Sequence, residues 1–183
     1  ARHWVDSVFK TLTPDEKLAQ LMVIRLSGLE AGHKVVFYDS LVDDEVRKYD
    51  VGGICLFQGD PLVQADHINH LQSIARTPIL FCIDAENGLG MRMDSVIPLP
   101  HQMMLGATQD TDLIYRYGQL VGKQCRRMGI QVNYAPVVDI NNNPYNPFIN
   151  DRSFGEDKIQ VAEDGVRYMK GLQDQGGMAC AKH

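Results

Sequence analysis

Runs of consecutive apolar residues recur along the chain, and the stretches between them carry apolar residues at helical spacing. Such runs are typical of strands buried on both faces of a sheet. They predict five strands, at residues 21–26, 51–57, 78–83, 130–140 and 178–181. The intervening spacing predicts helices after Thr13 and over residues 41–49, 62–75, 113–128 and about 157–175.

Local signals mark where two of these helices begin. Thr13-Pro14-Asp15-Glu16 has the pattern of a capping box, with proline at the first helical position. Ser40, followed by Asp43, predicts a second cap ahead of residues 41–49. We expect loops at residues 28–33 and at the Asn- and Pro-rich stretch 141–150.

Alternating strands and helices predict an α/β fold with parallel strands. Doubly wound sheets and (β/α)8 barrels share this local pattern, but no G-x-G-x-x-G motif follows the first strand, and Gly88-Leu89-Gly90 lacks the third glycine. A TIM-type barrel usually needs about 250 residues and eight strands. We therefore expect residues 1–183 to be the N-terminal portion of one barrel domain, with about five of its β/α units.

Composition narrows the class of protein. The 183 residues are 44% hydrophobic and 22% charged, which excludes a disordered chain. The net charge of −5 argues against nucleic acid as a partner, and no apolar stretch is long enough for a transmembrane segment. The cysteines form no C-x-x-C pair, and their apolar neighbours predict buried, reduced thiols at Cys55, Cys82, Cys125 and Cys180.

Polar residues follow several predicted strands, where ligands bind in α/β proteins. Asp84 comes directly after the third strand, and its carboxylate can accept hydrogen bonds from sugar hydroxyls. Equally, it can cap the next turn or pair with Arg92. Glu86 either forms a carboxylate pair with Asp84 or faces solvent.

Arg152 lies between the Asn-rich loop and the last predicted helix, and its rigid fork of donors can clamp a ligand. The alternative is a structural arginine that ties the loop to Asp139 or Asp151. Lys182 and His183 add donors at the end of the last strand. No metal site is expected.

Two histidines on one predicted helix are possible metal ligands. His67 and His70 are three residues apart, so they lie on one side of the helix, but no third ligand is evident. A solvated helix face is the favoured interpretation.

Six segments, in order, resemble the N-terminal domain of glycoside hydrolase family 3. They are residues 17–22 (KLAQLM), 52–54 (GGI), 83–84 (ID), 133–139 (NYAPVVD), 152–157 (RSFGED) and 178–183 (MACAKH). The chain is most similar to the β-N-acetylglucosaminidase branch, although better-known members carry E-G-G-R where this chain has Glu86-Asn87-Gly88-Leu89. Arg92 is therefore given no role by the resemblance.

The resemblance implies a retaining β-N-acetylhexosaminidase that releases terminal β-linked N-acetylglucosamine without a metal or organic cofactor. It implies that the sugar is bound by Asp84, Arg152, Lys182 and His183. The acid/base and the nucleophile are expected beyond His183, so residues 1–183 alone are expected to be inactive. The alternatives are a β-glucosidase of the same family and a carbohydrate-binding fragment without catalysis. Compartment and oligomeric state are left open.

Overall fold

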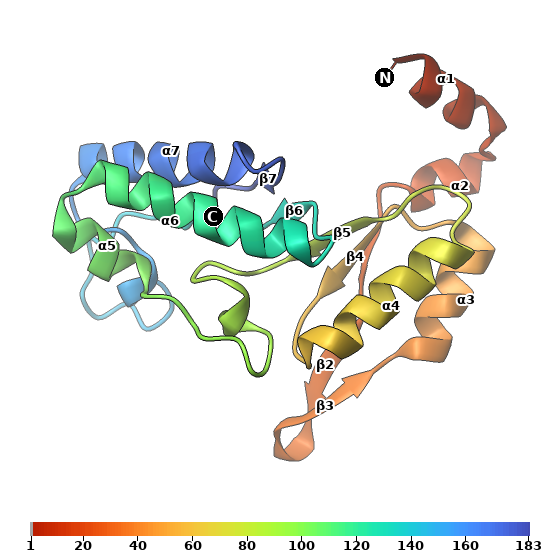
Figure 1. Cartoon of the computed structure of the whole chain (residues 1–183), viewed down its shortest axis with the longest axis horizontal. Coiled ribbons are helices and arrows are strands. Elements are labelled where there is room, and N and C mark those ends of the chain that lie inside the picture. Colours follow the sequence, from red (N-terminus) through yellow and green to blue (C-terminus); the bar gives the residue numbers. More distant parts are fainter. Residues whose placement is uncertain (1) are drawn as a thin grey trace. The chain divides into compact units, whose positions relative to one another are not determined.

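Strands and helices alternate along the computed structural model, which describes residues 2–183 (Figure 1). The chain divides into two compact units, one ending at Cys82 and the other running from Ile83 to His183. In each unit, one pair of neighbouring strands in the main sheet runs parallel. The predicted α/β class is confirmed.

The first unit contains β1 (Val23–Arg25), β4 (Gly53–Leu56) and most of β5 (Leu80–Ile83), as neighbours in that order. Strand β1 pairs with β4, with Val23 opposite Gly53. All four residues of β4 are buried, as the apolar run at 51–57 predicts.

The helices of the first unit are α1 (Arg2–Thr11), α2 (Pro14–Ala19), α3 (Asp39–Tyr49) and α4 (Pro61–Ile74). The predicted capping box is present: the Thr13 hydroxyl accepts from the Glu16 N–H at 3.2 Å, and the Glu16 carboxylate accepts from the Thr13 N–H at 2.8 Å. The predicted cap at Ser40 is wrong, because α3 already begins at Asp39 and its flanking residue, Tyr38, makes no side-chain cap.

Residues 28–33 are not a loop throughout, contrary to the prediction. Strands β2 (Ser27–Glu30) and β3 (Lys34–Phe37) form an antiparallel hairpin, joined by a short 3-10 turn at Ala31–His33. Gly32 has φ of 80°, which a tight turn needs. The glycines that suggested a loop therefore serve a hairpin whose second strand contains β-branched residues.

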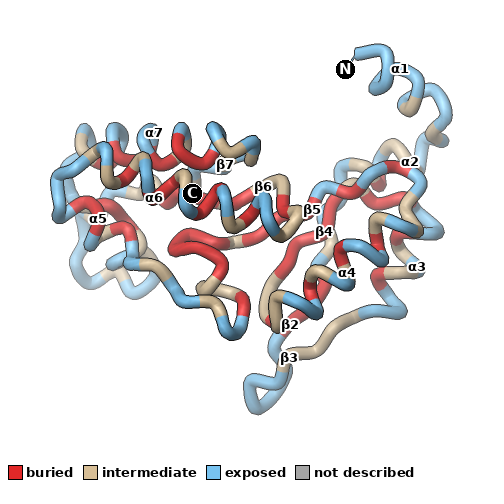
Figure 2. Tube along the Cα trace, in the orientation of Figure 1, coloured by how far each residue is buried: buried red, intermediate tan, exposed pale blue. Residues whose placement is uncertain are grey.

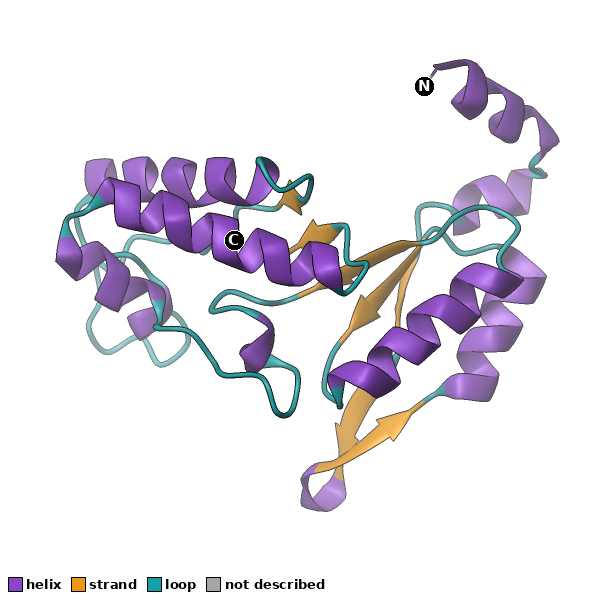
Figure 3. Ribbon diagram, in the orientation of Figure 1, coloured by secondary structure: helices purple, strands orange, loops and turns teal. Residues whose placement is uncertain are grey.

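The second unit contains β6 (Val132–Asn133), β7 (Met178–Ala179), and helices α5 (Gln102–Thr108), α6 (Thr111–Arg127) and α7 (Lys158–Gln173), with 3-10 turns at Leu89–Met91 and Asn150–Arg152. Helices α6 and α7 lie side by side (Figure 3). Their backbones approach so closely that a Cβ on Gly118 would collide with the Tyr168 carbonyl, and one on Gly171 with the Tyr115 carbonyl. Glycine is therefore required at this helix contact.

The strand predicted at 130–140 is much shorter than expected. Only β6 forms a ladder, with Val132 opposite Met178 of β7, and beyond it the chain pairs through a single bridge between Val137 and Lys182. After Asn133 the Ala135 N–H donates back to the Asn133 carbonyl at 2.8 Å instead of to β7, and Pro136 has no N–H with which to resume the ladder. The Tyr134 N–H donates to the carbonyl of Ile83, so the ends of β5, β6 and β7 come together.

Buried residues occur in the strands and helices of each unit (Figure 2), and most of the buried residues are apolar. In the second unit the fully buried ones include Ile83, Ile114, Val121, Tyr168 and Leu172. Between residues 2 and 183, no helix is both long and apolar enough to cross a membrane.

All four cysteines are free thiols, but their environments differ. Cys55, Cys82 and Cys125 are buried as predicted, and burial raises the pKa of Cys125 to about 12. The prediction is wrong for Cys180, which is exposed because it follows the short edge strand β7 and lines a cavity.

Candidate functional site

Asp84 is held rigidly at the end of β5. The next residue, Ala85, exchanges two hydrogen bonds with the side-chain amide of Asn133, a β6 residue, both at 3.0 Å. The Tyr168 hydroxyl of α7 donates to the carbonyl of Glu86 at 3.1 Å. Residues 84–86 are thus fixed from two sides, by a strand and by a helix.

Lys182 connects this segment with the end of the chain. Its Nζ lies 2.7 Å from Oδ1 of Asp84 and 2.7 Å from Oε1 of Glu86. Its backbone is set by the neighbouring segment, since the Val138 N–H donates to the Lys182 carbonyl at 2.8 Å and the Lys182 N–H donates to the Pro136 carbonyl at 3.1 Å.

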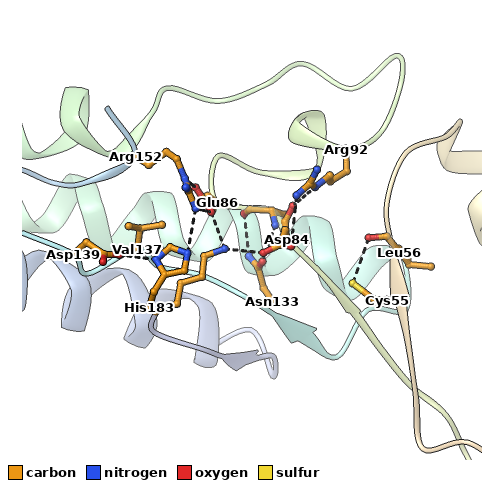
Figure 4. Close-up of polar contacts among 12 residues, drawn as sticks. Cys55, Leu56, Asp84, Glu86, Arg92, Asn133, Val137, Asp139, Arg152 and His183 are labelled. Atoms are coloured by element: carbon orange, nitrogen blue, oxygen red, sulfur yellow. Dashed lines mark hydrogen bonds and ion pairs between the residues drawn. The ribbon is translucent and has the colours of Figure 1, made fainter. Parts of the chain in front are cut away.

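Glu86 is paired with Arg152 as well as with Lys182 (Figure 4). Arg152 donates from Nε to Oε2 at 2.9 Å and from Nη2 to Oε1 at 2.8 Å, which is the two-pronged geometry that arginine forms with carboxylates. Only 5% of the Glu86 side chain is exposed. The arginine ties its loop to a carboxylate 66 residues earlier in the chain.

The two cations keep Glu86 charged despite its burial. Burial by itself raises the pKa of this carboxyl, but hydrogen bonds from Arg152 and Lys182, together with their charges, outweigh it. The pKa of Glu86 is consequently below its ordinary value. The same contact raises the pKa of Arg152.

The residues after Arg152 anchor its loop. The Ser153 hydroxyl is fully buried, donates to the Asp139 carbonyl at 2.6 Å and accepts from the Gly155 N–H at 3.2 Å. Phe154 inserts into the core. Ser153 and Phe154 therefore hold the backbone, and this leaves Arg152 directed at the site.

His183 lies between Asp139 and Arg152. Its Nδ1 is 2.7 Å from Oδ2 of Asp139, and its Nε2 is 3.3 Å from Nη2 of Arg152. Because arginine can only donate, this network assigns the proton to Nδ1 and makes Nε2 an acceptor. Asp139 thus orients the histidine ring.

Arg92 completes the cluster from the loop after β5. It donates from Nε to the backbone carbonyl of Asp84 at 3.2 Å, and its Nη2 lies 3.5 Å from Oδ2 of Asp84. Asp84 therefore pairs with Arg92, as one sequence interpretation held, and also with Lys182.

An open cavity of about 690 Å³ lies over these side chains. Asp84, Arg92, Arg152, Lys182 and His183 are among the residues that line it. This size is within the range of small-molecule sites, about 300–1,000 Å³. Charged donors and acceptors converging on one open cavity are suited to a ligand rich in hydroxyl groups.

The four residues expected to bind the sugar come together although up to 99 residues separate them in the sequence. Sequence reasoning missed that Glu86 is buried and central. The alternative interpretation offered Asp139 or Asp151 as the partner of a structural arginine, but Arg152 pairs with Glu86. The available signal was the D-x-E spacing, because alternate residues of an extended segment share a side. Asn133 gave no comparable signal.

His67 and His70 belong to no group of three potential metal-binding side chains among the residues that the structure describes. His67 lies 3.4 Å from Asp39, and His70 lies 2.8 Å from Asp43. These contacts link α4 to α3 in the first unit.

The chain matches known glycosidases over most of its length. Residues 13–183 match the family described as "Glycosyl hydrolase family 3 N terminal domain". A relative from Cellulomonas fimi named β-N-acetylglucosaminidase/β-glucosidase is 33% identical over 98% of this chain and 30% of its own length. A β-hexosaminidase of Mycobacterium tuberculosis is 31% identical over 94% of this chain and 43% of its own length.

The structure of a family 3 β-N-acetylglucosaminidase from Paenibacillus sp. str. FPU-7 is also similar. It has a TM-score of 0.78 and 35% identity over 94% of this chain and 33% of that chain. This similarity confirms the predicted barrel-type α/β class. The chain spans less than half the length of these relatives.

Proposed function

Because the chain belongs to glycosyl hydrolase family 3, we propose that it forms the sugar-binding part of a retaining β-N-acetylhexosaminidase. The proposed substrate is a terminal β-linked N-acetylglucosaminide. The observation that carries the proposal is the convergence of Asp84, Lys182, Arg152 and His183 on one cavity. The names of two relatives and one solved structure support this branch of the family.

In this proposal Asp84 accepts hydrogen bonds from sugar hydroxyls, because its carboxylate lies at the cavity with 24% of the side chain exposed. Lys182 has three N–H groups, two of which bind its carboxylate partners, and it donates the third to the sugar. Arg152 and His183 form the adjoining wall. No metal or organic cofactor is part of the proposed reaction.

Retaining hydrolysis needs a nucleophile and an acid/base on the two sides of the glycosidic bond. We propose that both come from sequence outside residues 1–183, which form the N-terminal portion of a single barrel domain. The greater length of the relatives supports this division.

The test is turnover by the protein at its natural length. We expect kcat/KM for para-nitrophenyl N-acetyl-β-glucosaminide to exceed that for the β-glucoside at least about tenfold, with the β-anomer as first product by NMR. Preference for the glucoside favours a β-glucosidase, a possibility supported by the double name of the Cellulomonas fimi relative. Sugar binding without turnover indicates a carbohydrate-binding module instead.

A further inference from the structure

Two carboxylates two residues apart occupy different places in the site. Asp84 reaches the cavity, with 24% of its side chain exposed, whereas the Glu86 side chain is 5% exposed. Both contact Lys182, but only Glu86 also contacts Arg152. Asp84 can therefore meet a ligand readily, whereas Glu86 also lines the cavity but is mostly covered by the two cations.

We propose that Glu86 is a positioning residue that fixes the Lys182 ammonium and the Arg152 guanidinium in the geometry that receives the sugar. This inference rests on the proposed function, and it adds a residue to which that function gives no role. Glu86 does not itself contact the sugar.

The contacts made by Oε1 of Glu86 carry the argument. This one oxygen lies 2.7 Å from Lys182 Nζ and 2.8 Å from Arg152 Nη2. The negative charge of Glu86 offsets the repulsion between the two cations that share this oxygen. If that charge is removed, the repulsion is unopposed. Without Glu86, Lys182 and Arg152 would separate, and at least one would leave its place at the cavity.

The count of donors points the same way. Arg152 has five N–H groups, of which two bind Glu86, one reaches the His183 ring and one binds the Phe148 carbonyl. One N–H of this arginine, which lines the cavity, is left for a ligand. Its main partner is Glu86. Because its Nη2 also contacts the His183 ring, the position of the arginine affects the position of the histidine.

The Glu86 backbone is rigid enough for this role. Its carbonyl accepts from the Tyr168 hydroxyl, and Tyr168 is fully buried in α7. Ala85, directly before it, is paired with Asn133. The carboxylate therefore has a fixed origin from which to hold two side chains that come from distant parts of the sequence.

The experiment is a double-mutant cycle in the protein at its natural length, with Glu86→Gln, Lys182→Met and both together. We expect Glu86→Gln to lower kcat/KM for the N-acetylglucosaminide about 10- to 100-fold. The double variant should lose clearly less than the product of the two single losses, because Glu86 acts in part through the lysine. Glu86→Asp keeps the charge and should recover part of the loss.

Asp164→Asn is the matched control, since Asp164 is also a buried carboxyl but lies on α7 and pairs with no cation among the described residues. It should retain kcat/KM within about twofold. Wild-type kcat/KM in Glu86→Gln, or fully multiplicative losses in the double variant, would overturn the inference. If Glu86→Gln does not fold, a kcat/KM equal to that of the wild type in Glu86→Asp would overturn the inference.

The design separates this inference from the proposed function. A wild-type protein that cleaves neither arylglycoside contradicts the proposed function, and the inference about Glu86 falls with it. If the wild type is active and Glu86→Gln has the same kcat/KM, only the inference is contradicted.

Discussion

Lys182 and Asp84 are 98 residues apart in the sequence, and their side chains meet at 2.7 Å. Each follows the end of a different strand of the parallel sheet, Lys182 beyond β7 and Asp84 directly after β5. The carboxyl ends of parallel strands share one edge, so the sheet itself brings the two together. Their pairing holds the aspartate side chain at the cavity.

Replacing Asp84 with Asn should abolish most activity of the protein at its natural length. The amide offers one acceptor oxygen where the carboxylate offers two, and it no longer balances the charges of Lys182 and Arg92. We expect kcat/KM to fall at least about 100-fold in a chromogenic assay. Asp94→Asn, an exposed carboxylate of the same loop, serves as control, and equal activity of the two variants would refute the role of Asp84.

Arg152→Lys should impair both stability and activity, although the charge is kept. Lysine cannot reproduce the two parallel hydrogen bonds to Glu86, which would stay buried with an incomplete set of partners. We expect a loss of about 1–2 kcal/mol in the free energy of unfolding by urea. The exposed Arg167→Lys should change neither property. An Arg152→Lys variant as stable as wild type would show that the fork is unimportant.

Acid should weaken the fold through Glu86. Its pKa is lower in the folded than in the unfolded chain, where the ordinary value is about 4.5. The charged carboxylate thus stabilises the fold above that pH, and the contribution is lost as pH falls through the folded pKa. Glu86→Gln should therefore be less stable than wild type at pH 7, with the difference shrinking below about pH 4.5.

Urea unfolding at several pH values measures this effect, and Glu163→Gln is a suitable control because that residue is exposed on α7. The free energy of unfolding of Glu163→Gln should equal that of the wild type at every pH. A constant difference between Glu86→Gln and wild type across the acid range is incompatible with the depressed pKa.

Gly118→Ala should destabilise the second unit. In a helix interior, alanine is ordinarily more favourable than glycine by about 1 kcal/mol. Here the added Cβ would collide with the Tyr168 carbonyl of α7, and separating the helices costs about 1–3 kcal/mol. Thermal unfolding should give a lower Tm than for Lys123→Ala, an exposed site on the same helix. A raised Tm in Gly118→Ala would mean that the helices are not in backbone contact.

Local signals predicted the elements that depend on local chemistry. The apolar run of β4 and the capping box at Thr13 were sufficient because strand burial and helix capping involve neighbouring residues. The β2–β3 hairpin was missed because its glycines resemble a loop when strand pairing is unknown. The length of β6 was overestimated because an apolar run does not show that the backbone after Asn133 turns back on itself through the Ala135 N–H.

The site was only partly predictable for a related reason. Asp84 and Lys182 stand at strand ends, and a sheet edge makes such residues neighbours. Whether Glu86 faces solvent or the interior depends on Arg152, 66 residues later, and on Lys182. The D-x-E spacing predicts that Glu86 shares a side with Asp84, but it does not indicate a contact with a residue so distant in the sequence.

A crystal structure of the natural-length protein with N-acetylglucosamine tests the central claim most directly. The sugar ring should occupy the cavity lined by Asp84, Lys182 and His183, with ring hydroxyls within about 3.2 Å of the Asp84 carboxylate and of Lys182 Nζ. Glu86 should remain on Arg152 and Lys182 without touching the sugar. A sugar bound elsewhere, with this cavity empty at saturating concentration, would contradict the account.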